Sequence, residues 1–163
     1  MLPDIMPIDK DLFRAVLGRF ASGVTVITTV DTSGRDQGMT VSAFSSLSLD
    51  PPLVLVCIDH RASLWPVFKT AEIFAINILA AAQEALSRRF SSKEGDRFDG
   101  TGFTRGSTGV ALLDDTLAAV ECTVIARIPH GDHSILIGSV ESGTARDLQP
   151  LLYYRGGYAS LTR

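Results

Sequence analysis

The chain has 163 residues, of which 45% are hydrophobic and 20% charged. This composition excludes general disorder, and the length suits one buried core, so we expect a single domain over residues 1–163. With 15 Lys and Arg against 18 Asp and Glu, the net charge is −3, which indicates neither a nucleic-acid partner nor an anionic membrane surface.

Two sequence features bear on the location of the protein. Residues 1–7 lack the basic start and apolar centre of a signal peptide. The longest apolar stretch, residues 74–82, is too short to span a bilayer. We therefore expect a cytoplasmic protein without membrane contact, in which Cys57 and Cys122 are buried thiols rather than a disulfide.

The first predicted element is an amphipathic helix that begins after Asp9, a good N-cap residue. Gly18 weakens this helix, and Gly23 is placed to end it. The β-branched run 24–30 then predicts a strand. The apolar residues of the helix share one face at helical spacing: Leu12, Phe13, Val16, Leu17 and Phe20.

A stretch rich in hydroxyls follows, over residues 38–52. A polar turn at 31–36 precedes it, so we expect it to return antiparallel to the strand at 24–30. One interpretation is the solvent-facing side of an edge strand. The other is a wall for a flat ligand with acceptors around its rim, bound by backbone N–H groups and hydroxyls. Composition leaves both open. The uncharged hydroxyl residues are Thr40, Ser42, Ser45, Ser46 and Ser48.

The next segment begins after two prolines with a continuous apolar run at residues 53–58, which predicts a buried strand. Ser63 is a candidate N-cap for a short helix over residues 64–68, with Pro66 tolerated in its first turn.

A strand is predicted at residues 73–79, with Asn77 as its one polar member. The alanine-rich run 80–90 predicts a helix. The polar, glycine-punctuated residues 91–109 predict a long loop without secondary structure, which is typical of a lid or binding loop and is our candidate for a gate.

The last third of the chain predicts a hairpin, with strands at 118–128 and 134–140, and a final short strand within 151–158. Strands separated mostly by turns do not fit the alternation of a parallel doubly wound sheet. We expect a mostly β fold, a closed or nearly closed antiparallel β-barrel with peripheral helices.

Several catalytic motifs are missing from the sequence. It has neither Gly-x-Gly-x-x-Gly after a strand nor a Walker A lysine, so the two standard nucleotide cradles are absent. The lack of Cys-x-x-Cys and His-Glu-x-x-His argues against a zinc site, and we expect no metal. Gly-x-Ser-x-Gly is also missing, which leaves a hydrolase triad without support.

One tight turn, residues 130–133, holds two imidazoles and a carboxylate. A metal site is the weakest interpretation because the ligands are few. A plain polar turn and a turn that presents His133 to a ligand both stay open.

Residues 38–54 resemble the signature of the short-chain flavin reductases, which are the reductase components of two-component flavin-dependent monooxygenases. These proteins belong to the flavin reductase-like, FMN-binding split-barrel family. The resemblance extends from about residue 13 to residue 158. Four further segments match in the same order: 20–26, 96–98, 131–133 and 151–158.

The resemblance implies a split antiparallel β-barrel that forms a homodimer, with flavin in a groove at the interface. It implies an NAD(P)H:flavin oxidoreductase that transfers hydride from NADH or NADPH to FMN or FAD and supplies reduced flavin to a partner monooxygenase. Alternatives are a split-barrel oxidase that holds FMN tightly and a non-catalytic flavin- or haem-binding module. The turn at 131–133 favours the reductase, because only a nicotinamide user needs that second ligand position.

The resemblance also assigns residues. His133 would lie beside the nicotinamide as the catalytic residue, with a positioning role, while Asn77 and Tyr158 would lie near the groove. The wall of the isoalloxazine and ribityl chain would comprise Met39, Thr40, Val41, Ser42, Ala43, Ser45 and Ser46. The phosphate end would lie near Cys57, Ile58, Ser63, Phe90, Ser91, Ser92 and Lys93. The choice between FMN and FAD stays open, and the absence of an Arg-rich patch beside the nicotinamide motif favours NADH.

Overall fold

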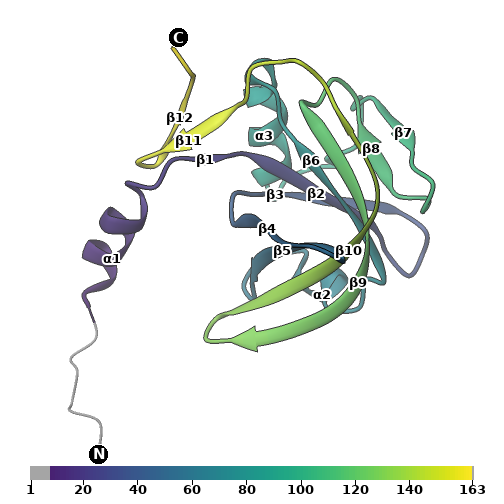
Figure 1. Cartoon of the computed structure of the whole chain (residues 1–163), viewed down its shortest axis with the longest axis horizontal. Helices are drawn as coiled ribbons and strands as arrows, with labels where there is room; N and C mark the ends of the chain where they lie inside the picture. Colours follow the sequence, from purple (N-terminus) through teal and green to yellow (C-terminus); the bar gives the residue numbers. More distant parts are fainter. Residues whose placement is uncertain (1–7, 163) are drawn as a thin grey trace, which may run out of the picture.

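The computed structural model describes residues 8–162, and most of its strands lie in one curved sheet (Figure 1). The seven strands of this sheet are β2 (Thr25–Val30), β3 (Asp36–Val41), β4 (Phe44–Leu49), β5 (Pro52–Asp59), β6 (Ile73–Ile78), β9 (Ala118–His130) and β10 (His133–Ala145). They run in the order β3-β2-β6-β9-β10-β5-β4, and every neighbouring pair is antiparallel. The expected mostly β, antiparallel fold is confirmed.

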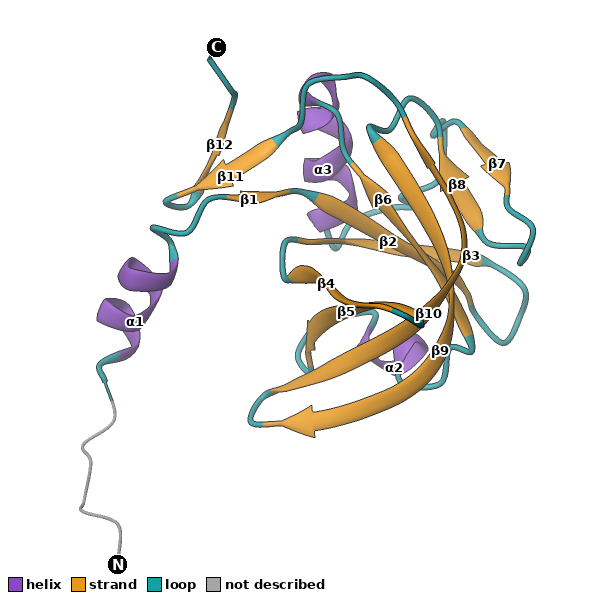
Figure 2. Cartoon of the chain, viewed as in Figure 1, coloured by secondary structure: helices purple, strands orange, loops and turns teal. Residues whose placement is uncertain are grey.

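The barrel is open along one seam. The edge strands β3 and β4 follow one another in the chain and are joined only by Ser42 and Ala43. The sheet curls so that these edges approach (Figure 2). The Cys57 N–H donates to the Ala43 carbonyl at 2.9 Å, which continues the β4–β5 ladder to Ala43. Among the described residues β3 and β4 do not pair with each other. The hydroxyl-rich stretch is therefore the segment that crosses the seam of a split barrel.

Two smaller sheets accompany the barrel. One contains β1 (Ser22–Gly23), β11 (Leu152–Tyr154) and β12 (Gly157–Ala159), and the other β7 (Phe103–Arg105) and β8 (Ala111–Leu113). The C-terminal segment is thus a hairpin rather than one strand. The prediction of a structureless loop over residues 91–109 was wrong, because β7 lies inside it and pairs with β8.

The first helix, α1 (Lys10–Leu17), begins as predicted. The Asp9 carboxylate accepts from the backbone N–H groups of Asp11 and Leu12 at 3.0 and 3.1 Å. The helix ends at Gly18, earlier than expected, and Gly23 lies in β1 instead. Helix α1 stands away from the barrel (Figure 1), and none of its residues is buried.

The other helices pack on the barrel. They are α2 (Trp65–Phe68), the 3₁₀ turn η1 (Ala81–Gln83) and α3 (Glu84–Ser91). The prediction that Ser63 caps α2 was wrong: Leu64 occupies the cap position, and the Ser63 hydroxyl accepts from the Arg97 guanidinium at 3.3 Å. Helix α3 covers the outer side of β2 and β3 and buries Phe90 completely.

The core consists of two layers separated by β2, which is buried on both faces. Ile27 packs inside the barrel with Val56 and Phe68, while Val26 packs outside it with Phe90. Strand β5 alternates between buried residues and half-buried ones, so the expectation of full burial holds only for its inner face. No helix of the described structure covers the outer face of β5, so only the face that points into the barrel is shielded from water.

The described residues contain no helix that is long and apolar enough to cross a membrane. The sequence expectation about a signal peptide concerns residues 1–7 and lies outside the described residues.

Candidate functional site

Strand β3 has a free edge at the seam, because within residues 8–162 it pairs only with β2. The Gly38 carbonyl on this edge accepts from the Arg97 guanidinium at 2.7 Å. In an antiparallel strand, alternate residues present their backbone groups to the same edge, so Thr40 directs its backbone N–H to the seam as well. A free strand edge of this kind offers hydrogen-bond donors to a ligand with acceptors along its rim.

Helix α3 is fastened to β3 and to β12 by hydroxyl groups. Thr40 Oγ1 donates to the Ser87 carbonyl at 2.7 Å, and Ser91 Oγ donates to the same carbonyl at 2.8 Å. The hydroxyls of Ser87 and Tyr158 are 2.8 Å apart. The Arg88 guanidinium lies over the Tyr158 ring, 4.8 Å from its centroid. These contacts fix the position of Tyr158 at the seam.

Two adjoining cavities lie between β3, α3 and the C-terminal hairpin, with volumes of about 210 and 370 Å³. Ser91, Tyr153 and Tyr158 line both. Between them the cavities bring together five residues that the sequence predicts for the site: Thr40, Ser42, Ser91, Ser92 and Tyr158.

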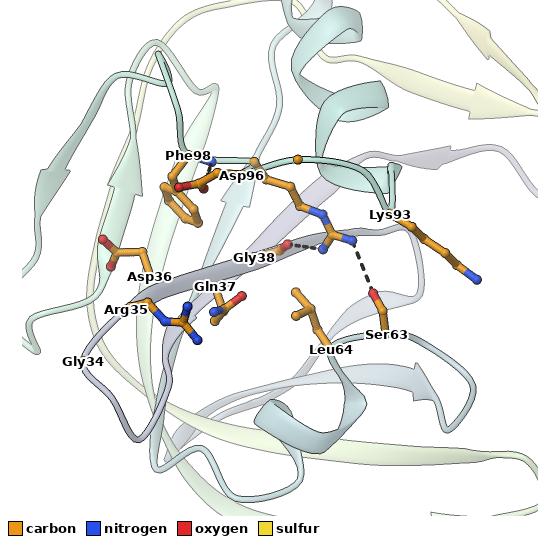
Figure 3. A pocket seen from close by; sticks show the side chains of 12 residues that line it. Gly34, Arg35, Asp36, Gln37, Gly38, Ser63, Leu64, Lys93, Asp96 and Phe98 are labelled. Carbon is orange, nitrogen blue, oxygen red and sulfur yellow. Dashed lines mark hydrogen bonds between the residues drawn. The ribbon is translucent and has the colours of Figure 1, made fainter.

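A larger cavity, about 590 Å³, lies at the other end of β3 (Figure 3). The predicted residues Ser63 and Lys93 line it. Arg97 crosses its wall and donates to the Ser92 and Gly38 carbonyls at 2.8 and 2.7 Å. Burial lowers the pKa of the Arg97 guanidinium, because charge is less stable away from water.

Five predicted site residues belong to the core instead. Met39 and Val41 alternate with Thr40 and pack inside the barrel. Ile58 and Phe90 are buried. Asn77 is also fully buried, and its side chain is satisfied by the protein: it donates to the Val26 carbonyl and the Thr28 hydroxyl and accepts from the Leu113 N–H. We assign these side chains a structural role, because alternation along the strands and burial keep them away from the groove.

The remaining wall residues lie across the seam. Ala43, Ser45 and Ser46 are exposed where β4 begins. Cys57 is half-buried on the outer face of β5 and is a free thiol. Cys122, the other thiol, is buried, and burial raises its pKa to about 12.

His133 begins β10, directly after the turn from β9. Its Nδ1 lies 2.7 Å from the Asp132 carboxylate, which accepts a hydrogen bond from it. This hydrogen bond lowers the pKa of Asp132 and leaves the Nε2 of His133 for another partner. His133 shares the outer face of the barrel with Cys57. Along the strand ladders its backbone is two strands and two residues from Ala43, about 12 Å at ordinary spacings.

The segment that follows β5 holds the His133 turn in place. His60 donates its backbone N–H to the Asp132 carbonyl at 2.9 Å, and its Nε2 is 2.9 Å from the Ser134 hydroxyl. Asp59 is the register partner of His133. The described residues show no group of three or more His, Cys, Asp or Glu side chains arranged to hold a metal ion.

Sequence reasoning missed Ser87, Arg88 and Arg97. Ser87 lies four residues before Ser91 and therefore on the same helix face, a signal that was available in the sequence. Arg97 belongs to a segment that matched the family, but two of its three acceptors, Gly38 and Ser63, are far away in the chain, and a single sequence does not show that they meet.

Comparisons with known proteins identify the family and agree with the fold. Residues 17–162 match the family described as flavin reductase like domain. The reductase subunit of a flavin-dependent monooxygenase from Rhodococcus jostii (strain RHA1) is 39% identical over 155 residues, which cover 94% of this chain and 79% of that protein. An NADH-dependent flavin reductase from a Rhodococcus species is 41% identical, over 98% of this chain and 89% of the relative.

Among solved structures, the NADH:FAD oxidoreductase of Streptomyces globisporus C-1027, in complex with NAD and FAD fragments, superposes with a TM-score of 0.90. It is 32% identical, and the match covers 97% of this chain and 96% of that one. The chain therefore belongs to the flavin reductase-like domain family.

Proposed function

We propose that the chain is an NAD(P)H:flavin oxidoreductase that supplies reduced flavin to a partner flavin-dependent monooxygenase. One observation carries the proposal: in a member of this family, the barrel seam presents neutral hydroxyls and the free edge of β3 beside cavities of suitable size. The relatives named above are NADH-dependent or are reductase subunits, which supports the same activity for this chain.

The residues at the seam fit a phosphorylated flavin. The isoalloxazine is rimmed with acceptors, and the free edge of β3 offers N–H donors with the Thr40 and Ser42 hydroxyls beside them. Ser63 and Lys93 line the larger cavity, where they suit a phosphate. The smaller seam cavity has no charged side chain in its lining, which is compatible with a flavin that enters and leaves as a substrate.

Hydride transfer takes place between the two nucleotides: the nicotinamide would give a hydride and the flavin would accept it. The protein therefore needs no covalent nucleophile. The chain holds the two rings in register and excludes water between them. Backbone N–H groups at the β3 edge stabilise the negative charge that develops on the ring edge.

His133 is proposed to position the nicotinamide. Asp132 holds its Nδ1, so the imidazole presents Nε2 outward from the barrel.

A homodimer would complete the groove. The outer face of the barrel and the first helix expose large apolar side chains, and such surface on a water-soluble domain is typical of an interface. The most exposed on the barrel are Leu47, Leu49, Ile125 and Ile128. Light scattering after gel filtration tests the dimer: a monomer mass at micromolar concentration would contradict it. The cytoplasmic location and the single-domain organisation stay predictions.

One assay separates the reductase from the alternatives. Purified protein is mixed with NADH or NADPH and with excess free FMN, FAD or riboflavin, and nicotinamide oxidation is followed. Turnover that rises with added flavin supports the proposal. A yellow protein that holds its flavin through purification and does not oxidise NADH or NADPH supports a binding module, and turnover independent of added flavin supports a tightly bound FMN.

A further inference from the structure

The side chain of His133 has little support of its own. Within residues 8–162 its one hydrogen bond joins Nδ1 to the Asp132 carboxylate, and solvent reaches both side chains. Asp59, the register partner of His133, is engaged elsewhere, because its carboxylate accepts hydrogen bonds from the backbone N–H and the guanidinium of Arg61. The place at which the imidazole meets a ligand therefore depends on how the backbone on either side of His133 is held.

His60 contacts both chain neighbours of His133. Its backbone N–H donates to the Asp132 carbonyl at 2.9 Å, next to the register pair that joins the end of β5 to the start of β10. Its imidazole Nε2 lies 2.9 Å from the Ser134 hydroxyl. The two hydrogen bonds therefore enclose His133 in the chain, one on the residue before it and one on the residue after it.

The contact with Ser134 lies at a buried position. Ser134 is 4% exposed and is in register with the buried Ile58, so its side chain points into the barrel, on the face opposite to that of His133. In the described part of the chain, the hydroxyl of Ser134 has His60 Nε2 as its one partner. A buried hydroxyl that loses its partner costs stability, so this contact resists opening.

Helix α2 fixes the position of the His60 ring. The ring centroids of His60 and Trp65 are 4.8 Å apart, and Trp65 packs against the barrel core. Phe68, at the other end of α2, is fully buried. Arg127 of β9 donates to carbonyls at and just after this end, so α2 is also fastened to the β9–β10 hairpin beside it (Figure 1). The side chain that holds Ser134 thus belongs to a rigid frame.

We propose that His60 is a positioning residue for hydride transfer: by holding Asp132 and Ser134, it sets where His133 presents Nε2 to the nicotinamide. This inference rests on the proposed function, in which His133 contacts the nicotinamide. His60 acts through His133 rather than on the ligand, because its own Nε2 is engaged at a buried hydroxyl. It lines neither of the seam cavities, so its loss should weaken the use of NADH without changing flavin binding.

Three variants alter the contact between His60 and Ser134 in different ways. Ser134→Ala deletes the hydroxyl with the smallest change of shape. His60→Phe keeps a ring against Trp65 and loses the hydrogen bond. His60→Gln is the conservative variant, because its amide reaches about as far as Nε2 and can bond the hydroxyl. Ser139→Ala, further along β10 and away from the turn, is the matched control.

The KM and kcat for NADH are measured at saturating flavin, and flavin dissociation constants are measured by fluorescence quenching without nicotinamide. We expect Ser134→Ala and His60→Phe to raise the KM for NADH about threefold to tenfold, the size of one lost hydrogen bond. Their flavin dissociation constants should change by less than about twofold. His60→Gln should bring the KM for NADH back toward that of the unchanged protein, and Ser139→Ala should not alter it.

A double-variant comparison shows whether His60 and Ser134 act through His133. Ser134→Ala should raise the KM for NADH when His133 is present and have no effect on it in a His133→Ala background, because the group that is positioned is then gone. Thermal unfolding of each variant is recorded alongside. The loss of stability caused by Ser134→Ala should be the same in both backgrounds, since it does not involve the His133 imidazole.

An unchanged KM for NADH in Ser134→Ala and His60→Phe, with only the unfolding temperature lowered, would overturn the inference and assign His60 a structural role. An effect of Ser134→Ala that persists without His133 would overturn it too, as would flavin binding weakened by the same factor as NADH use. All these results leave the proposed function standing as long as the unchanged protein oxidises NADH with free flavin. Failure of the unchanged protein to do so would instead refute the proposed function itself.

Discussion

Gly38 and Phe90 approach so closely that a Cβ on Gly38 would lie 2.8 Å from the ring carbon Cε1 of Phe90. This close contact sets how α3 packs on β3, and α3 carries Ser87 and Ser91, which line the seam cavity. Gly38→Ala should therefore lower the free energy of unfolding by about 1–3 kcal/mol through overpacking and weaken flavin binding as α3 shifts. Chemical denaturation and flavin titration measure the two effects. Gly23→Ala is the matched control because a Cβ there meets open space, and equal losses in both variants would contradict the account.

The hydrogen bond between Tyr158 and Ser87 offers a second test. Tyr158→Phe and Ser87→Ala should each cost about 0.5–1.5 kcal/mol of stability and should not be additive when combined, because they remove one interaction. Flavin affinity should fall in both single variants. Tyr154→Phe, an exposed tyrosine of β11, provides the control. Fully additive losses would show that the two hydroxyls act independently.

His133 is expected to serve the nicotinamide rather than the flavin. His133→Ala should raise the KM for NADH by about tenfold or more and change the dissociation constant of the flavin by less than about twofold. His130, its exposed register partner at the far side of the turn, is the matched position for a control alanine. An equal loss of nicotinamide use and flavin binding in the His133 variant would contradict the assignment.

Glu121 controls the acid stability of the β7–β8 hairpin. Burial alone would raise the pKa of this carboxyl, but hydrogen bonds from Thr108, Ser142 and Ser107 outweigh it and lower the pKa to about 2. Because the folded pKa lies below the ordinary value of 4.5, the stabilisation is complete above about pH 4.5 and is lost as the pH falls through about 2. Its size is on the order of 3 kcal/mol.

Glu121→Gln should therefore lower the free energy of unfolding at neutral pH and flatten its decline between pH 5 and 2. Denaturant titrations across this range measure both. The exposed Glu141→Gln should leave the pH profile unchanged. A Glu121→Gln profile as steep as that of the unchanged protein would refute the role of this carboxylate.

Local patterns predicted much of the fold, and long-range contacts account for what they missed. The Asp9 cap and the β-branched run of β2 are local signals, and both appear in the structure. The burial of Val41 and Asn77 and the partial burial of Met39 depend on which face of each strand meets the core, which a run of mixed residues does not reveal. Arg97 and Glu121 hold their loops through partners far along the chain, so residues 91–109 resembled unstructured sequence.

The resemblance of residues 38–54 predicts the site at this segment, and the structure shows where the segment lies in the barrel. It is where the chain crosses from one edge of the sheet to the other. Alternation along β3 turns Met39 and Val41 into the barrel, whereas most of β4 is exposed. The larger cavity at the start of β3 brings residues of two matched segments, Gly38 and 96–98, next to residues 34–37, and only the structure shows that these parts meet.

The most direct test of the account is an anaerobic reaction of the purified protein with NADH and free flavin, in which nicotinamide oxidation and flavin bleaching are recorded together. The account predicts that both occur only with the protein present, that they proceed in equal amounts, and that the reaction continues until the free flavin is consumed. Flavin that stays oxidised while NADH persists, with NADPH equally unreactive, would contradict the assignment of the chain as a flavin reductase.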